Sequence, residues 1–130
     1  MEKRWIVTGL SLLILGIILG AFGAHALKDI ITDPEKLASF ETAVRYQLIN
    51  SIAFLIIPFI AKHFAVTTKA IFGLLLTGVL FFCVSIYLLT LKDQLGLGGF
   101  GKVLGPVTPL GGLLMIIGWT ILLVKVVRKR

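Results

Sequence analysis

The sequence predicts an all-α integral membrane protein, a four-helix bundle built as a single membrane domain over residues 1–130. Hydrophobic residues make up 58% of the chain and charged residues 15%, whereas soluble domains hold about 45–50% apolar and about 25% charged residues. The mean hydropathy is +1.05. Four apolar runs are each long enough to cross a bilayer, which takes about 20 residues. They cover approximately residues 5–26, 42–64, 70–91 and 108–127.

The basic residues lie between these runs and at both ends of the chain, and the formal net charge is +7. Anionic lipid headgroups are the expected partners of charges in such positions. Nucleic acid is not expected, because no basic face with interleaved aromatic residues exists outside the apolar runs. No cofactor and no metal are expected either, since Cys83, His25 and His63 are far apart and lack the spacing of a ligand pair.

Glycines recur along one face of the first span. Gly9, Gly16, Gly20 and Gly23 stand at i, i+7, i+11 and i+14, so they share one helical stripe. Such small residues let two membrane helices approach closely. His25 is the first ionisable residue after the uncharged run, and it lies about 160° around an ideal helix from Gly9. We therefore expect the stripe to pack against another helix and His25 to face away from it.

A helix start precedes the second span. Asp33 suits the N-cap, Pro34 the first helical position and Glu35 the first turn. A short amphipathic segment is therefore expected to lead from the interface into the second span. Glu41 and Arg45 stand at i, i+4 with the acidic residue first, which is the better order for a helical ion pair.

Polar residues continue inside the second and third spans. Gln47, Asn50 and Ser51 form a stripe in the second span, which Pro58 is expected to kink. Polar groups at such a depth mark interhelical hydrogen bonds or a functional site. The third span holds small or hydroxylic residues that suit packing and interhelical hydrogen bonds: Gly73, Thr77, Gly78, Cys83, Ser85 and Tyr87.

A glycine-rich loop is predicted between the third and fourth spans, over residues 92–107. Thr108 and Pro109 are then predicted to begin the fourth helix as its N-cap and first residue. Gly111 and Gly112 follow directly and permit close helix packing.

Four spans place both termini and the second loop on one side of the membrane. Eight basic residues lie on that side and five on the other, and positive residues favour the cytoplasm, so both termini are expected to be cytoplasmic. The eight are Lys3, Arg4, Lys62, Lys69, Lys125, Arg128, Lys129 and Arg130, and the five are Lys28, Lys36, Arg45, Lys92 and Lys102.

The same topology gathers polar residues toward the outer face. The candidates for a polar or ligand-binding cluster there are His25, Glu41, Arg45, Tyr46, Gln47, Asn50 and Thr108. Two helix N-termini point partial positive charge at this face, which suits an anionic headgroup or the charged end of a small solute. Equally, the cluster could satisfy itself, with His25 bonding to Glu41 or Tyr46 and fixing the bundle. Both hypotheses stay open.

Three ordered motifs resemble those of a known family. They are GAFGAHAL at 20–27, FETAVRYQ at 40–47, and TPLGG at 108–112 followed by Gly-Trp at 118–119. The chain resembles the small four-span membrane proteins of unknown function that include YgdD and YwdK (domain-of-unknown-function family four-two-three). The resemblance implies a bacterial plasma-membrane location and a four-helix bundle, with no established activity. That family usually has a histidine where this chain has Asn50, and an amide cannot titrate, which weakens any proton-transfer role there.

Three functions are compatible with this pattern. The first is a non-enzymatic plasma-membrane protein that acts by helix packing as a scaffold, accessory subunit or lipid-interacting protein. Its partners would be membrane lipids, a second copy of the chain or an unidentified membrane protein. The second is a small homo-oligomeric channel or transporter lined by Gln47, Asn50 and Ser51, with a polar site at the outer face. The third, a lipid-acting enzyme with His25 and Glu41 as acid and base, lacks a nucleophile or metal set, so no enzymatic activity is expected.

Overall fold

The computed structural model describes residues 2–129, which are helical apart from short connections and contain no strand. The elements are α1 (Glu2–Ala24), α2 (Ala26–Ile30), α3 (Pro34–Phe64), α4 (Lys69–Val79), the π-helix η1 (Leu80–Val84), α5 (Ser85–Thr90), the 3₁₀ turn η2 (Gly98–Phe100) and α6 (Gly101–Arg128). Elements α4, η1 and α5 join end to end into one rod. This third rod and the helices α1, α3 and α6 are long and apolar enough to cross a membrane, which confirms the predicted all-α four-helix bundle.

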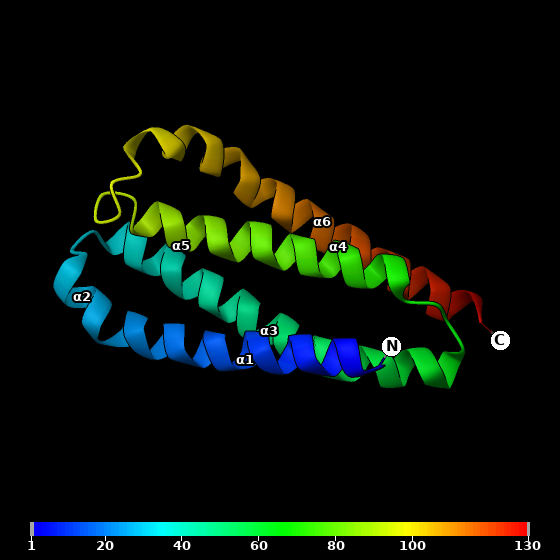
Figure 1. Ribbon diagram of the computed structural model, residues 1–130. Coiled ribbons are helices and arrows are strands. Elements are labelled where there is room, and N and C mark those ends of the chain that lie inside the picture. Colours follow the sequence, from blue (N-terminus) through cyan, green and yellow to red (C-terminus); the bar gives the residue numbers. More distant parts are fainter. Residues whose placement is uncertain (1, 130) are drawn as a thin grey trace.

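The rods form two antiparallel hairpins that pack against each other. Helix α1 lies along α3, the third rod lies along α6, and α3 meets η1 and α5 between the hairpins. Both ends of the chain and the α3–α4 connection lie at one end of the bundle, whereas α2 and the α5–α6 connection lie at the other (Figure 1). The apolar windows of α3 and the third rod are 44% and 50% buried, against 17% for α1 and 22% for α6. Groups on α3 and the third rod therefore fill the interior.

The glycine stripe of α1 faces α3. A Cβ atom added at Gly9, Gly16 or Gly23 would lie 2.8, 2.7 or 2.9 Å from a side-chain atom of α3, and one added at Gly20 would lie at 3.2 Å. Distances below 3 Å are closer than real Cβ contacts. The stripe is therefore the surface on which α1 packs, and its partner is a helix of the same chain.

A second close approach joins the third rod to α6. A Cβ atom added at Gly111 would overlap the backbone nitrogen of Phe82 and lie 2.7 Å from the carbonyl oxygen of Gly78. The neighbouring Gly112 has more room, because its added Cβ would be 3.8 Å from the Phe82 ring. Of these two predicted packing glycines, Gly111 stands at the closest contact.

The predicted start of α3 is confirmed. Asp33 is the N-cap, and its Oδ1 accepts a hydrogen bond of 2.9 Å from the backbone N–H of Glu35. Pro34 occupies the start of the helix, where a proline loses no helical hydrogen bond. The helix then continues through Pro58 to Phe64.

The predicted start of the fourth helix is wrong. Helix α6 begins at Gly101, so residues 101–107 are helical rather than part of a loop, and Pro106 and Pro109 lie inside the helix. Each proline removes one backbone N–H donor, and membrane helices tolerate this where neighbouring groups re-satisfy the freed carbonyl. The cap pattern at Thr108 and Pro109 therefore did not mark a boundary.

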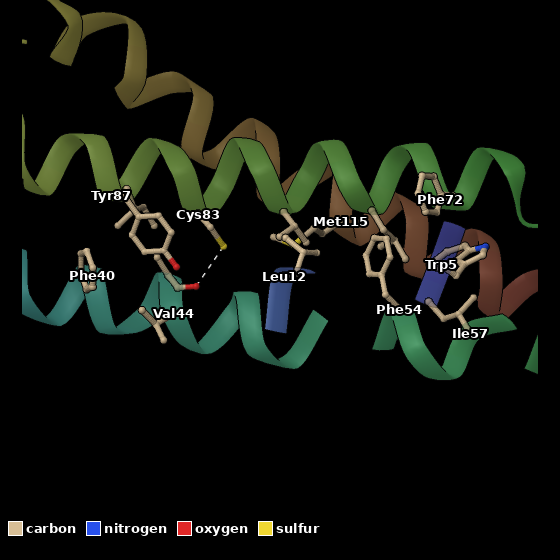
Figure 2. Packing of buried hydrophobic residues seen from close by; sticks show 14 of the residues in the cluster. Trp5, Leu12, Phe40, Val44, Phe54, Ile57, Phe72, Cys83, Tyr87 and Met115 are labelled. Atoms are coloured by element: carbon tan, nitrogen blue, oxygen red, sulfur yellow. Dashed lines mark hydrogen bonds between the residues drawn. The ribbon is translucent and has the colours of Figure 1, made fainter. Parts of the chain in front are cut away.

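Aromatic side chains fill the core near the chain termini (Figure 2). The Trp5 ring lies 4.9 Å from the rings of both Phe54 and Phe72, measured between centroids. Its indole N–H donates a hydrogen bond of 3.3 Å to Thr68 Oγ1. Farther along the bundle, the rings of Phe40 and Tyr87 are 5.0 Å apart. These contacts tie α1 and α3 to the third rod along its length.

Candidate functional site

The polar stripe of α3 is buried at the centre of the bundle. Gln47, Asn50 and Ser51 are each at most 4% exposed. Gln47 Nε2 donates a hydrogen bond of 2.9 Å to the carbonyl oxygen of Leu12 in α1. Gln47 Oε1 accepts a hydrogen bond of 2.7 Å from the Tyr87 hydroxyl in α5. A single carboxamide thus joins three rods.

Asn50 extends these contacts to α6. Its Nδ2 donates to the backbone carbonyl of Tyr46 at 2.8 Å and lies 3.7 Å from Met115 Sδ. Its Oδ1 accepts a hydrogen bond of 3.4 Å from the Trp119 indole N–H. The Asn50 amide therefore serves as both donor and acceptor. Sequence reasoning noted Trp119 only as part of a family motif and did not assign it to this network.

The π-helix η1 and the start of α5 carry a second set of polar contacts. Cys83 Sγ donates to the carbonyl oxygen of Ala43 at 3.2 Å, across the interface with α3 (Figure 2). Ser85 Oγ lies 2.5 Å from Thr108 Oγ1 in α6 and 3.0 Å from the carbonyl oxygen of Phe82. The interhelical hydrogen bonds predicted for the third span are thus present at Cys83, Ser85 and Tyr87.

The interior network is closed. Within residues 2–129 every buried side-chain nitrogen and oxygen atom has a hydrogen-bond partner. An unpaired polar group in the hydrocarbon region costs several kcal/mol, so such pairing strongly favours the folded bundle. Gln47 and Asn50, which the sequence places in the outer cluster, belong to this interior network.

The predicted ion pair at the start of α3 is confirmed. Arg45 Nη2 lies 3.2 Å from Glu41 Oε1, and the two side chains are 63% and 74% exposed. Exposed pairs of this kind contribute little to stability. Tyr46 is also exposed on one side, and its ring packs against Phe82 at a tilt of 51°, with centroids 4.7 Å apart.

His25 does not join these residues. It is exposed and occupies the turn between α1 and α2, with φ −124° and ψ −83°. Among residues 2–129, no hydrogen bond links its side chain to Glu41 or Tyr46. The bond from His25 to Glu41 or Tyr46, one of the two hypotheses left open by the sequence, is therefore not formed; the chain turns at His25 into α2, whose Leu27 is fully buried.

Two grooves open at the end of the bundle opposite the termini. The first has a volume of about 590 Å³ and lies between the end of α1, α2 and the start of α3; Lys28 and Glu41 are among its lining residues. The second, of about 600 Å³, lies between α3, α5 and α6 and is lined in part by Lys36 and Thr108. Lys36 Nζ also forms an ion pair of 3.2 Å with Asp93. The expected outer cluster is therefore dispersed: Glu41 lines the first groove and Thr108 the second. Gln47 and Asn50 are buried in the interior, whereas His25, Arg45 and Tyr46 are exposed and line neither groove.

In the part of the chain that the structure describes, residues 2–129, no group of three His, Cys, Asp or Glu side chains could hold a metal ion. The polar groups described above are amides, hydroxyls, a thiol and two ion pairs, Glu41–Arg45 and Lys36–Asp93, each with one residue that lines a groove.

Four apolar rods, packed through glycines and joined by buried polar side chains, define a small multi-pass membrane protein. The model of the family described as "Protein of unknown function (DUF423)" matches residues 19–112. This chain belongs to that family, as its motifs indicated.

Curated relatives extend over nearly the full length of the chain. A UPF0382 membrane protein of Staphylococcus aureus (strain bovine RF122 / ET3-1) is 36% identical over 94% of this chain and 93% of its own. The UPF0382 membrane protein YwdK of Bacillus subtilis (strain 168) is 32% identical over 97% and 98%. One from Schizosaccharomyces pombe is 37% identical over 92% and 98%. No solved structure matches the chain. The names of the relatives and the four apolar helices identify a multi-pass membrane protein.

Proposed function

We propose that this protein is a non-enzymatic component of the plasma membrane that acts by helix packing, as a scaffold or accessory subunit in contact with membrane lipids. The observation that carries the proposal is the closed network around Gln47. A solute path needs polar groups that face the path, whereas Gln47 and Asn50 are engaged by the backbone and side chains of their own bundle.

The outer faces of the bundle support the same function. Large apolar side chains are exposed on α1 and α6, among them Ile14, Ile17 and Ile18 on α1 and Ile116 and Leu123 on α6. Such faces suit acyl chains or the apolar helix of a membrane partner. Their extent on both outer rods matches a protein whose work is done at its lipid-facing surface.

Flux measurements test the proposal against the alternative of a homo-oligomeric channel or transporter. The purified chain is reconstituted into liposomes, and ion and proton flux are compared with those of empty vesicles and of vesicles that hold a known ionophore. We expect no flux above that of the empty vesicles. Flux that the Gln47→Leu variant abolishes would overturn the proposal in favour of the channel.

A further inference from the structure

We propose that the groove between α1, α2 and α3 binds one zwitterionic phospholipid, with the phosphate at Lys28 and the headgroup ammonium at Glu41. This inference rests on the lipid-contacting part of the proposed function and names the lipid class and its site. The groove encloses about 590 Å³ and is open to the surroundings.

The length of α3 is compatible with a groove at the depth where lipid headgroups meet acyl chains. Helix α3 has 31 residues, which gives a length of about 46 Å at the usual rise. The hydrocarbon core of a bilayer is about 30 Å thick, so one or both ends of α3 extend into the interface. The groove is lined by the start of α3, from Pro34 to Val44, and by the segment in which α1 ends and α2 begins.

The lining combines an apolar floor with charged side chains. Leu37 and Ala38 contribute most of the apolar surface from α3, whereas Phe40 and Val44 lie beneath it and are nearly buried. The opposite wall includes Gly20 and Gly23, whose lack of a side chain lets α1 lie close to Val44 and Phe40 at the bottom of the groove. An acyl chain can bind in this groove. Lipid tails are as apolar as the protein surface, so a chain gains energy there only through the close van der Waals contacts that the shape of the groove permits.

The two charges that line the groove have opposite signs. Lys28 forms no ion pair within residues 2–129, so its ammonium group can bind a phosphate. Arg45 contacts only Oε1 of Glu41 and the carboxylate is largely exposed, which leaves Oε2 able to accept a hydrogen bond from a primary ammonium. A phosphatidylethanolamine headgroup offers both partners. A phosphatidylglycerol headgroup offers the phosphate but no cation for Glu41.

Native mass spectrometry of the purified full chain tests this site. The protein is titrated with phosphatidylethanolamine and phosphatidylglycerol that carry identical acyl chains. We expect one retained lipid per chain and a preference for the ethanolamine headgroup. Ala38→Phe places a ring in the groove from an exposed position and should weaken binding about tenfold or more. Ala21→Phe, on an exposed α1 position outside the groove lining, should leave binding unchanged.

Charge variants separate the two headgroup contacts. Lys28→Gln should weaken the binding of both lipids about tenfold through loss of a charge-assisted hydrogen bond. Lys102→Gln, at the same end of the bundle, should leave the binding of both lipids unchanged. Glu41→Gln should abolish the preference for ethanolamine. Arg45→Gln breaks the same ion pair but keeps the carboxylate, so the preference should persist.

Circular dichroism first establishes that each variant retains its helical content. The proposed site would be overturned if Ala38→Phe bound lipid as tightly as Ala21→Phe does. It would also be overturned if Glu41→Gln kept the preference for the ethanolamine headgroup. The flux assay reports on the proposed function separately. Absence of lipid selectivity together with absence of flux would refute the groove site alone, and flux lost in Gln47→Leu would refute the non-transporting function.

Discussion

Gln47 is the residue at which three rods of the bundle meet. Its amide donates to the α1 backbone and accepts from the Tyr87 hydroxyl, and it is 4% exposed. Polar side chains in membrane helices are enriched at such interfaces because hydrocarbon offers them no other partner. The position of this residue therefore determines how α1, α3 and α5 are aligned.

Gln47→Leu should lower the free energy of unfolding by about 1–3 kcal/mol, because two interhelical hydrogen bonds of about 0.6–1.7 kcal/mol each are lost. Tyr87→Phe removes only one of these bonds and should cost about half as much. Unfolding of the protein in mixed micelles by increasing sodium dodecyl sulfate measures both values. Equal stability of Gln47→Leu and the unmodified chain would contradict the assigned role of the network.

Cys83 should be protected from alkylation in the folded protein. Its side chain is 1% exposed, and its thiol donates to the Ala43 carbonyl oxygen at the α3 interface. We expect a maleimide reagent to modify the folded protein in bilayers slowly and the unfolded protein promptly, since cysteine reactivity requires access. Mass spectrometry over time gives both rates, and prompt modification of the folded protein would show that the interface opens.

At the scale of elements, glycines allow two pairs of rods to approach closely, and the two contacts differ in whether side-chain or backbone atoms lie next to the glycine. Along α1, the atoms nearest the stripe are mainly flexible side-chain ends, such as Leu48 beside Gly16. At Gly111, the nearest atoms belong to the backbone of Gly78 and of η1, which cannot retreat without moving the rod. The contact between η1 and α6 is consequently the less tolerant of the two.

Two adjacent glycines provide a matched test of this contact. Gly111→Ala should destabilise the protein by about 1–3 kcal/mol through overpacking. Gly112→Ala has ordinary van der Waals space and should be neutral or stabilise it by up to about 1 kcal/mol, the difference in helix propensity. The same micelle titration measures both. A similar loss of unfolding free energy in both variants would contradict a specific backbone contact at Gly111 and would indicate that this turn of helix tolerates no alanine.

For the whole molecule, the bundle places both ends of the chain and the α3–α4 connection together (Figure 1). Lys125 of α6 donates to Thr67 of that connection at 2.7 and 3.0 Å. The end of the bundle that holds the termini has eight basic residues and the opposite end has five. The positive-inside rule therefore predicts cytoplasmic termini.

Single cysteines in a Cys83→Ala background test this orientation in intact cells. Gln94→Cys lies in the α5–α6 connection and Lys129→Cys at the opposite end, and both positions are exposed. A membrane-impermeant maleimide should label Gln94→Cys only, and permeabilised cells should give labelling of both. Labelling of Lys129→Cys alone before permeabilisation would reverse the predicted topology.

Local patterns were sufficient where one segment determines its own structure. The cap at Asp33 and the Glu41–Arg45 pair depend on residues within one turn of helix, and both predictions were confirmed. Prediction failed where a local signal competes with tertiary contacts. Thr108 and Pro109 have the form of a helix start, yet α6 begins seven residues earlier than Thr108, and Thr108 instead bonds to Ser85. The alternative in which His25 bonds to Glu41 or Tyr46 is not realised, and a turn at His25 leads the chain into α2.

The sequence by itself determined the membrane class, the four rods, the pairing of both termini at one end and the family, because hydropathy, span length and motif order are properties of the linear chain. Only the tertiary structure decided that Gln47 and Asn50 are engaged inside the bundle, that α1 packs on α3 and that Glu41 and Thr108 line different grooves. The physical reason is that a polar side chain in lipid takes its partner from whichever helix lies beside it. That neighbour is set by the packing of all four rods together.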